Sequence, residues 1–214
     1  MPPSVPRTAI SFASPFPIGE SPFRVKGVLY QGTASFFATK VKGGMAALLH
    51  QIEDERLRAF ISQRFLAASF YDVLPVHPLI HAEARACNLP LAAYLRQRSE
   101  YQAEQDMAGV YKVLLKLASP EAVLARFPRL ATQWLNFAKA ELIDASADGV
   151  RGFALSGMPA VLAAWYVNGL AVYAQHAVKL AGAKKCQVTM LPPEPEGQAH
   201  GVDLVRVRFQ VQWT

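Results

Sequence analysis

The sequence predicts an α+β domain: an N-terminal helical half, then a β-hairpin, a long helix and a second β-hairpin that together make a four-stranded antiparallel sheet. Two observations lead to this prediction. The stretch from Pro159 to Leu180 is apolar on nearly every side, which is typical of a buried helix. The segments around it alternate apolar and polar residues, which is the period of a strand with one buried face.

The last strand has the clearest alternation, with its apolar residues expected on one face and Arg206 and Arg208 on the other. The apolar face should comprise Val205, Val207, Phe209, Val211 and Trp213. Cys186–Met190 alternates in the same way. The proline-rich segment 192–197 between these strands predicts an exposed connection without regular structure.

The other hairpin is expected before the long helix. Asp148-Gly149 is a turn signal between the strand segments 137–145 and 150–155. Ser156 is placed to cap the long helix and Pro159 to occupy its first turn. Gly182 stands where a helix often ends in a left-handed residue.

The first two thirds of the chain predict mainly helices. A strand is expected over Val25–Tyr30 and an aromatic tight turn over Phe70–Pro75. The helices are expected at about 36–41, 45–52, 54–68, 78–88, 91–108 with a bend at Gly109 into 110–117, and 120–126, resuming beyond Pro128 to Leu135. Ser119 should cap the helix that begins at Pro120, which lies in its first turn.

The chain divides into an arm and one domain. Residues 1–22 contain six prolines and predict an extended or disordered arm, with docking onto the fold as the alternative. Residues 23–214 form the single α+β domain, because no linker or internal repeat interrupts them.

Composition restricts the location and the class of protein. The 214 residues are 52% hydrophobic and 18% charged, with a net charge of +6, which suits a sizeable core. The long apolar stretch is too short for a membrane span and is interrupted by Asn168-Gly169. The start lacks the pattern of a signal peptide, so we expect a cytoplasmic protein. Its low charge favours a homo-oligomer or a protein partner.

Motifs for chemistry are few. His77 and His81 have the spacing of helical metal ligands, but His77 precedes Pro78 and should lie outside the helix, so we expect no metal. Nucleophile elbows and phosphate loops are absent. We therefore expect no catalytic residues and no cofactor.

The most polar stretch leaves alternatives open. Arg96, Glu100 and Glu104 are candidates for docking a partner, with Arg96 compensating the two glutamates. In the enzyme alternative, a cluster of Arg98, Glu100, Glu104 and Asp106 faces a cleft. In the nucleic-acid alternative, Arg206 and Arg208 form a basic strip, but it lacks the aromatic side chains of single-strand binders.

Several stretches resemble an uncharacterised myxobacterial paralogous family over about 23–213. They are Val25–Tyr30, the Phe70–Pro75 turn, the Arg96–Leu117 helix and Ser119-Pro120-Glu121. This resemblance implies no particular chemistry.

The layout also resembles the superfamily of haem nitric-oxide-binding domains, four-vinyl-reductase domains and Bet3-type vesicle-tethering subunits. The resemblance is carried by Gly27-Val28-Leu29, several helices and then hairpin, apolar helix, hairpin. It implies a small apolar ligand between helices and sheet, or an assembly subunit. The haem version needs a histidine between Ser119 and Asn136 and a Tyr-x-Ser-x-Arg run, and both are absent here. Neither Cys87 nor Cys186 matches the acylated cysteine of the Bet3 version.

From these observations we expect a non-enzymatic ligand-sensing or protein-assembly module without haem. An apolar pocket should lie between the long helix and the sheet. The residues expected to line it are Trp165, Tyr166, Asn168 and Tyr173.

Overall fold

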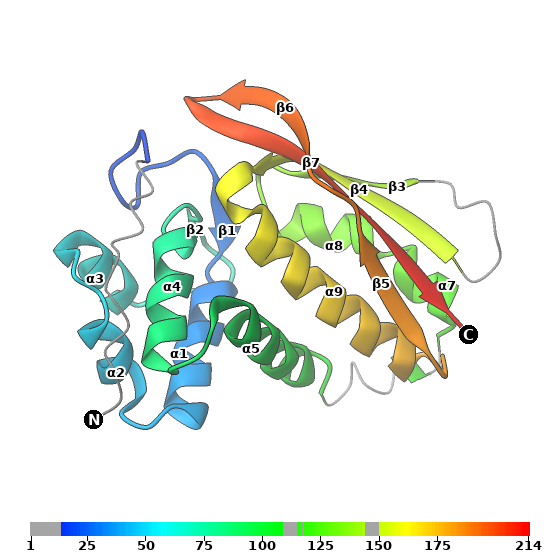
Figure 1. Cartoon of the computed structure of the whole chain (residues 1–214), viewed down its shortest axis with the longest axis horizontal. Helices are drawn as coiled ribbons and strands as arrows, with labels where there is room; N and C mark the ends of the chain where they lie inside the picture. Colours follow the sequence, from blue (N-terminus) through cyan, green and yellow to red (C-terminus); the bar gives the residue numbers. More distant parts are fainter. Residues whose placement is uncertain (1–13, 109–114, 117, 144–149) are drawn as a thin grey trace.

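The computed structural model describes residues 14–108, 115–116, 118–143 and 150–214. The helical half precedes the sheet in the chain, as predicted (Figure 1). Its elements are β1 (Arg24–Lys26), α1 (Val28–Lys40), α2 (Gly44–His50), α3 (Glu55–Ser62), β2 (Phe70–Asp72), α4 (Val76–Ala86), α5 (Leu91–Asp106), α7 (Pro120–Leu124) and α8 (Phe127–Trp134).

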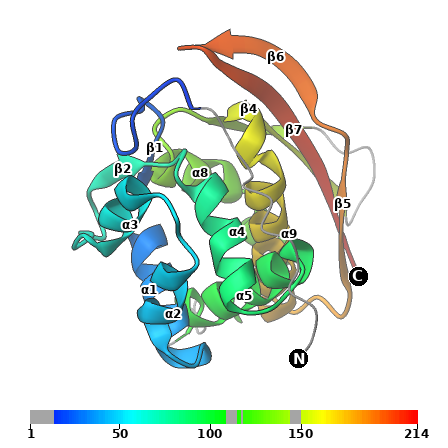
Figure 2. The same cartoon turned by 60° about the vertical axis from the view of Figure 1, so that its left-hand side comes forward.

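The sheet half confirms the predicted order of hairpin, long helix and further strands. Its elements are β3 (Lys139–Ile143), β4 (Val150–Pro159), the short 3-10 turn η1 (Ala160–Leu162), α9 (Ala163–Leu180), β5 (Cys186–Met190), β6 (Glu194–Ala199) and β7 (Val202–Trp213). Helix α9 lies between the sheet and the helical half, in contact with α5, β5 and β7 (Figures 1 and 2).

The antiparallel sheet has five strands where the sequence predicts four. Its order is β3-β4-β7-β5, and β6 continues the line of β5 along the same edge of β7. The expectation that the proline-rich segment is irregular was therefore wrong. Pro195 pairs with Val205 in β6, which is an edge strand, and a missing N–H is tolerated there. The predicted Asp148-Gly149 turn and the predicted bend at Gly109 lie outside the described residues.

The start of the long helix also differs from the prediction. Ser156 lies within β4 and does not cap a helix, and Pro159 is the last residue of that strand. Gly157, which comes directly after Ser156, adopts φ +78° in a β-bulge. A Cβ added there would lie 2.9 Å from the Phe137 carbonyl oxygen. The end of α9 was predicted correctly, because Gly182 adopts φ +101°.

Three details of the helical half correct the predictions. The predicted strand ends at Lys26, and Val28 begins α1. The aromatic turn includes a strand, β2, which pairs with β1. His77 lies inside α4, because Pro78 occupies the third position of that helix, where its missing N–H costs nothing.

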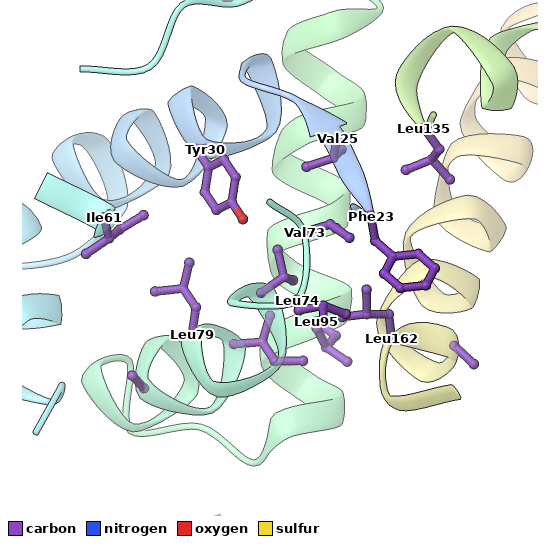
Figure 3. Packing of buried hydrophobic residues seen from close by; sticks show 14 of the residues in the cluster. Phe23, Val25, Tyr30, Ile61, Val73, Leu74, Leu79, Leu95, Leu135 and Leu162 are labelled. Carbon is purple, nitrogen blue, oxygen red and sulfur yellow. The ribbon is translucent and has the colours of Figure 1, made fainter. Parts of the chain in front are cut away.

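The core consists of two clusters of buried side chains. The first joins β1 and helices α1 to α5 to η1 and the start of α9. In Figure 3, side chains such as Tyr30, Leu79, Leu95 and Leu162 point into the space between their elements. The second cluster joins α5, α7, α8 and α9 to the inner face of the sheet.

The described part of the N-terminal arm, residues 14–22, is fastened by one carboxylate. Asp72 is 1% exposed and accepts hydrogen bonds from the backbone N–H groups of Gly19 at 2.9 Å and Ser21 at 3.2 Å. It also accepts one from the Ser21 hydroxyl and one from the Leu74 N–H at 2.9 Å. These bonds tie the segment to β2, more than 50 residues away in the chain, while Phe16 and Ile18 pack against the first cluster.

Among the described residues, no helix combines the length and apolarity that a membrane crossing requires.

Candidate functional site

An apolar pocket lies where α8, α9 and the inner face of the sheet meet. We call it the helix–sheet pocket. Helix α9 contributes Tyr166 and Leu170, which are four residues apart and so share one face of the helix. The other main walls are Phe127 and Ala131 of α8, Phe153 of β4 and Phe209 of β7.

Aromatic contacts fix the walls of this pocket. Phe153 and Phe209 lie opposite each other on β4 and β7, and their rings stack at 4.9 Å. Phe127 meets Phe153 at 6.0 Å between ring centroids. The accessible volume is about 20 Å³, slightly more than a single water needs. The pocket thus has room for a molecule of only a few heavy atoms unless its walls move.

Tyr166 is one of the four residues predicted to line the pocket, and it supplies the polar side-chain group of the wall. Its hydroxyl makes no hydrogen bond within the part of the chain that the structure describes. Burial raises the pKa of Tyr166 well above its usual value, so the hydroxyl stays neutral. It can donate or accept one hydrogen bond without bringing a charge into the pocket.

The other three predicted pocket residues lie elsewhere around α9. Trp165 contacts the Tyr166 ring at 6.0 Å and packs on the first cluster. Asn168 donates to the Ala164 carbonyl at 2.7 Å in its own helix. The Tyr173 hydroxyl donates to Asp106 of α5. Residues turn by 100° each on a helix, so Trp165 and Asn168 point to other sides than Tyr166, whereas Tyr173 lies on the same face two turns further along, where it meets α5.

The charged residues of α5 divide between two faces. Arg98 donates to Gln102 at 2.8 Å, and Gln102 donates to Asp106 at 2.7 Å, so a half-buried polar row runs along one face towards Tyr173. Burial raises the pKa of Asp106, while the Gln102 hydrogen bond and the Arg98 charge oppose that shift.

The other face of α5 holds the proposed docking residues. Arg96 pairs with Glu100 at 2.9 Å, with side-chain exposures of 76% and 41%, and Glu104 is exposed. The four charges of the enzyme alternative therefore do not meet at one place. Arg98 and Asp106 are on the half-buried row, whereas Glu100 and Glu104 face solvent.

A buried carboxyl that sequence reasoning missed lies beside this row. Glu83 of α4 is 2% exposed, and its Oε2 accepts a hydrogen bond from Tyr94 at 2.6 Å. Its Oε1 has no hydrogen-bond partner of normal geometry among the described residues, although the Thr33 hydroxyl is near. Burial raises the pKa of Glu83, and Tyr94 and Arg98 only partly oppose this.

The histidine pair forms a contact within α4. The rings of His77 and His81 meet edge to face at 5.2 Å, and burial lowers both pKa values. Among the described residues, no three side chains of His, Cys, Asp or Glu gather as a metal site requires.

Arg206 and Arg208 lie on the outer face of β7, as the alternation predicted, but each is paired. Arg206 bridges to Glu141 of β3, and Arg208 bridges to Glu194 of β6. Both Nε atoms are buried. A phosphate would have to displace these carboxylates, so the strip is poorly suited to nucleic acid.

The comparisons with known proteins come from solved structures, since no protein-family model and no curated protein matches the chain. An oxygen-binding H-NOX domain related to soluble guanylate cyclases superposes with a TM-score of 0.59 at 9% identity, over 88% of this chain and 95% of that chain. The unliganded Fe(II) H-NOX protein from K. algicida gives 0.58 at 12% identity, over 88% and 96%. A structure solved to explain H-NOX activation gives 0.59 at 7% identity, over 89% and 96%.

At these identities the comparisons show the fold alone. The chain has an H-NOX-like α+β fold, which confirms the predicted resemblance to haem nitric-oxide-binding domains at that level. The resemblances to the myxobacterial family and to Bet3-type subunits stay predictions.

Helices α7 and α8 offer no side chain that could ligate a haem iron. The positions that α7 and α8 bury are occupied by Val123, Leu124, Phe127 and Ala131, which cannot ligate iron. The chain's five histidines lie outside these helices. The helix–sheet pocket, at about 20 Å³, is also far below the roughly 300 Å³ at which pockets for larger ligands begin.

Proposed function

We propose that this chain is a haem-free, non-enzymatic sensing module that binds a small apolar molecule in the helix–sheet pocket. The observation that carries the proposal is the pocket itself. It lies between the long helix and the sheet, and Tyr166 is part of its wall.

The chemistry of the walls sets the class of ligand. The side chains are aromatic or aliphatic except for the Tyr166 hydroxyl, which matches pockets that hold apolar molecules and orient them by one polar group. The volume limits the ligand to a few heavy atoms. A charged ligand would lose its hydration without gaining a partner charge.

Helix α9 provides a route from the pocket to the helical half. Tyr166 and Leu170 line the pocket, and Tyr173 on the same helix donates to Asp106 of α5. A ligand that shifts α9 therefore changes a half-buried hydrogen bond to α5. The polar row from Arg98 to Asp106 continues that contact along α5.

Two features support the absence of enzymatic chemistry and of haem. The charged residues of α5 divide between two faces, and helices α7 and α8 bury only apolar side chains. An assembly role, by analogy with the Bet3-type resemblance, is the second candidate. A cytoplasmic location remains a prediction.

Xenon is the test probe, because it enters small dry cavities without needing hydrogen bonds. Methyl NMR spectra of the full chain, recorded at increasing xenon pressure, should show saturable shifts at Leu170 and Ala131. Native mass spectrometry of protein purified from its own host should then reveal any retained natural ligand.

A filling variant and a matched control locate the binding. Ala131→Leu places extra atoms in the pocket and should abolish the xenon shifts. Gln133→Leu adds the same side chain two residues later at an exposed position and should leave them unchanged. Shifts that fail to saturate, or that survive Ala131→Leu, would overturn the proposal and leave assembly as the better candidate.

A further inference from the structure

The β3 edge of the sheet has unpaired backbone. Within the described residues, β3 pairs with β4 on one side and makes no backbone hydrogen bond on the other. The other edge of the sheet is formed by β5 and β6, which pair with β7 end to end. An open edge is a template for another strand, and natural proteins usually cover it or restrict what can pair with it.

Exposed apolar side chains flank this edge on its helix side. Leu142 of β3 is 45% exposed, and Leu130 of α8, the helix packed against β3, is 46% exposed. Leu142 is in register with Phe153, whose ring lies in the second cluster, so Leu142 points to the helix-covered face. Both leucines thus lie on elements at or beside the open edge.

The outer face of β3 carries two charges of opposite sign, two residues apart. Lys139 makes no ion pair among the described residues. Glu141 is bound from the side of β7 by Arg206 and is exposed on its other side. In an antiparallel pair, residues directly opposite each other lie on the same face of the sheet.

We propose that β3 is the interface of a homodimer in which two copies pair antiparallel about a two-fold axis at Ala140. In this register Lys139 of each copy lies opposite Glu141 of the other, so the same patch complements itself twice. The register shifted by one residue, with Glu141 on the axis, would place like charges opposite each other. The two-fold axis also brings the Leu130 and Leu142 side chains of both copies to the same side of the joined sheets.

This pairing commits the edge to a second copy of the chain. The five-residue strand is short and charged, which disfavours pairing with arbitrary strands. The order of its charges, however, is complementary to itself, because Lys139 of one copy lies opposite Glu141 of the other in the antiparallel pair. The inference does not rest on ligand binding, because its pairing groups are the backbone edge and the outer-face charges of β3, although Ala140 on the axis also lines the helix–sheet pocket.

Two complementary charge variants test the register. Lys139→Glu alone places glutamates opposite each other in both cross-strand pairs, and Glu141→Lys alone places lysines opposite each other. Each variant should weaken self-association about tenfold or more. An equimolar mixture of the two should recover it, because both pairs of the heterodimer are then complementary.

Sedimentation velocity of the full chain over a range of concentrations measures the association, and circular dichroism verifies folding. Lys185→Glu makes the same charge change before β5 and should sediment as wild type does. A wild-type chain that stays monomeric overturns the proposal. So does a dimer that tolerates Lys139→Glu, or two folded variants whose mixture stays monomeric. None of these outcomes bears on xenon binding.

Discussion

Replacing the buried Glu83 by glutamine should stabilise the protein at neutral and higher pH. Glu83 is 2% exposed, and the Tyr94 beside it is fully buried. An unsatisfied buried polar atom such as its Oε1 costs about 1–3 kcal/mol. Glutamine keeps the volume and an oxygen that accepts from Tyr94, and its amide group can donate to the nearby Thr33 hydroxyl.

The pH dependence of the free energy of unfolding gives the magnitude and the sign of this effect. Burial raises the pKa of Glu83 in the folded chain above the ordinary 4.5. Between the two values the folded chain holds a proton that the unfolded chain has lost, so the free energy of unfolding falls as pH rises. The fall is about 1.4 kcal/mol for each pH unit in that window. Glu83→Gln removes this loss, so its advantage over wild type should grow with pH.

Urea denaturation at about pH 5 and about pH 8 measures the difference. The variant should exceed wild type by at least about 1 kcal/mol at the higher pH and by less at the lower pH. Glu104→Gln, an exposed change on α5, controls for the loss of one negative charge. The reasoning is refuted if Glu83→Gln is less stable than wild type and its deficit widens with pH, because Glu83 would then be a favourably ionised partner of Arg98.

Four further substitutions test the packing, the N-terminal segment and a helix cap. Gly27→Ala puts a Cβ at 2.3 Å from the Leu66 carbonyl oxygen and should cost about 1–3 kcal/mol, lowering the melting temperature. Gly169→Ala, in the middle of α9 with its nearest neighbour at 3.8 Å, should instead stabilise by about 1 kcal/mol and raise it. Asp72→Ala leaves buried N–H donors without an acceptor and should make residues 14–22 susceptible to limited proteolysis. Cleavage would remain slow if that segment were held by packing alone. Ser119→Ala removes the α7 cap and should cost about 1 kcal/mol in urea denaturation.

Features with a local cause were predicted from the sequence. The alternation that placed Val207, Phe209 and Val211 on one face of a strand is confirmed, because all three are buried. The Ser119 hydroxyl accepts from the Ala122 N–H as a cap does, and Gly182 adopts a left-handed conformation after α9. These signals depend only on neighbours within a few residues.

Features that depend on distant partners were predicted less well. The prolines of β6 argued against a strand, yet an edge position beside β7 accepts them. Val28–Tyr30 has the composition of a strand, but β1 pairs only over three residues with β2 and makes a single bridge to Leu135, and α1 begins at Val28. Glu83 gave no signal of burial, because a single glutamate in a helix is usually exposed.

The candidate site shows the same division. The sequence predicted a pocket between the long helix and the sheet. Of the four residues predicted to line it, only Tyr166 is among the residues that line the helix–sheet pocket. Phe209 was predicted to face inward, whereas Phe127 and Ala131 lie on a helix whose position was not predictable. A helix that is apolar on all sides does not encode which side meets the sheet.

By itself, then, the sequence determined the fold class, the order of its elements and the inward face of the last strand, since hydrophobic periodicity and turn chemistry act locally along the chain. Only the tertiary structure decided the fifth strand, the split of the α5 charges between two faces, the burial of Glu83 and the open edge of β3. Each of these depends on which surfaces the packed elements present to one another, and that is set by contacts between residues far apart in the chain.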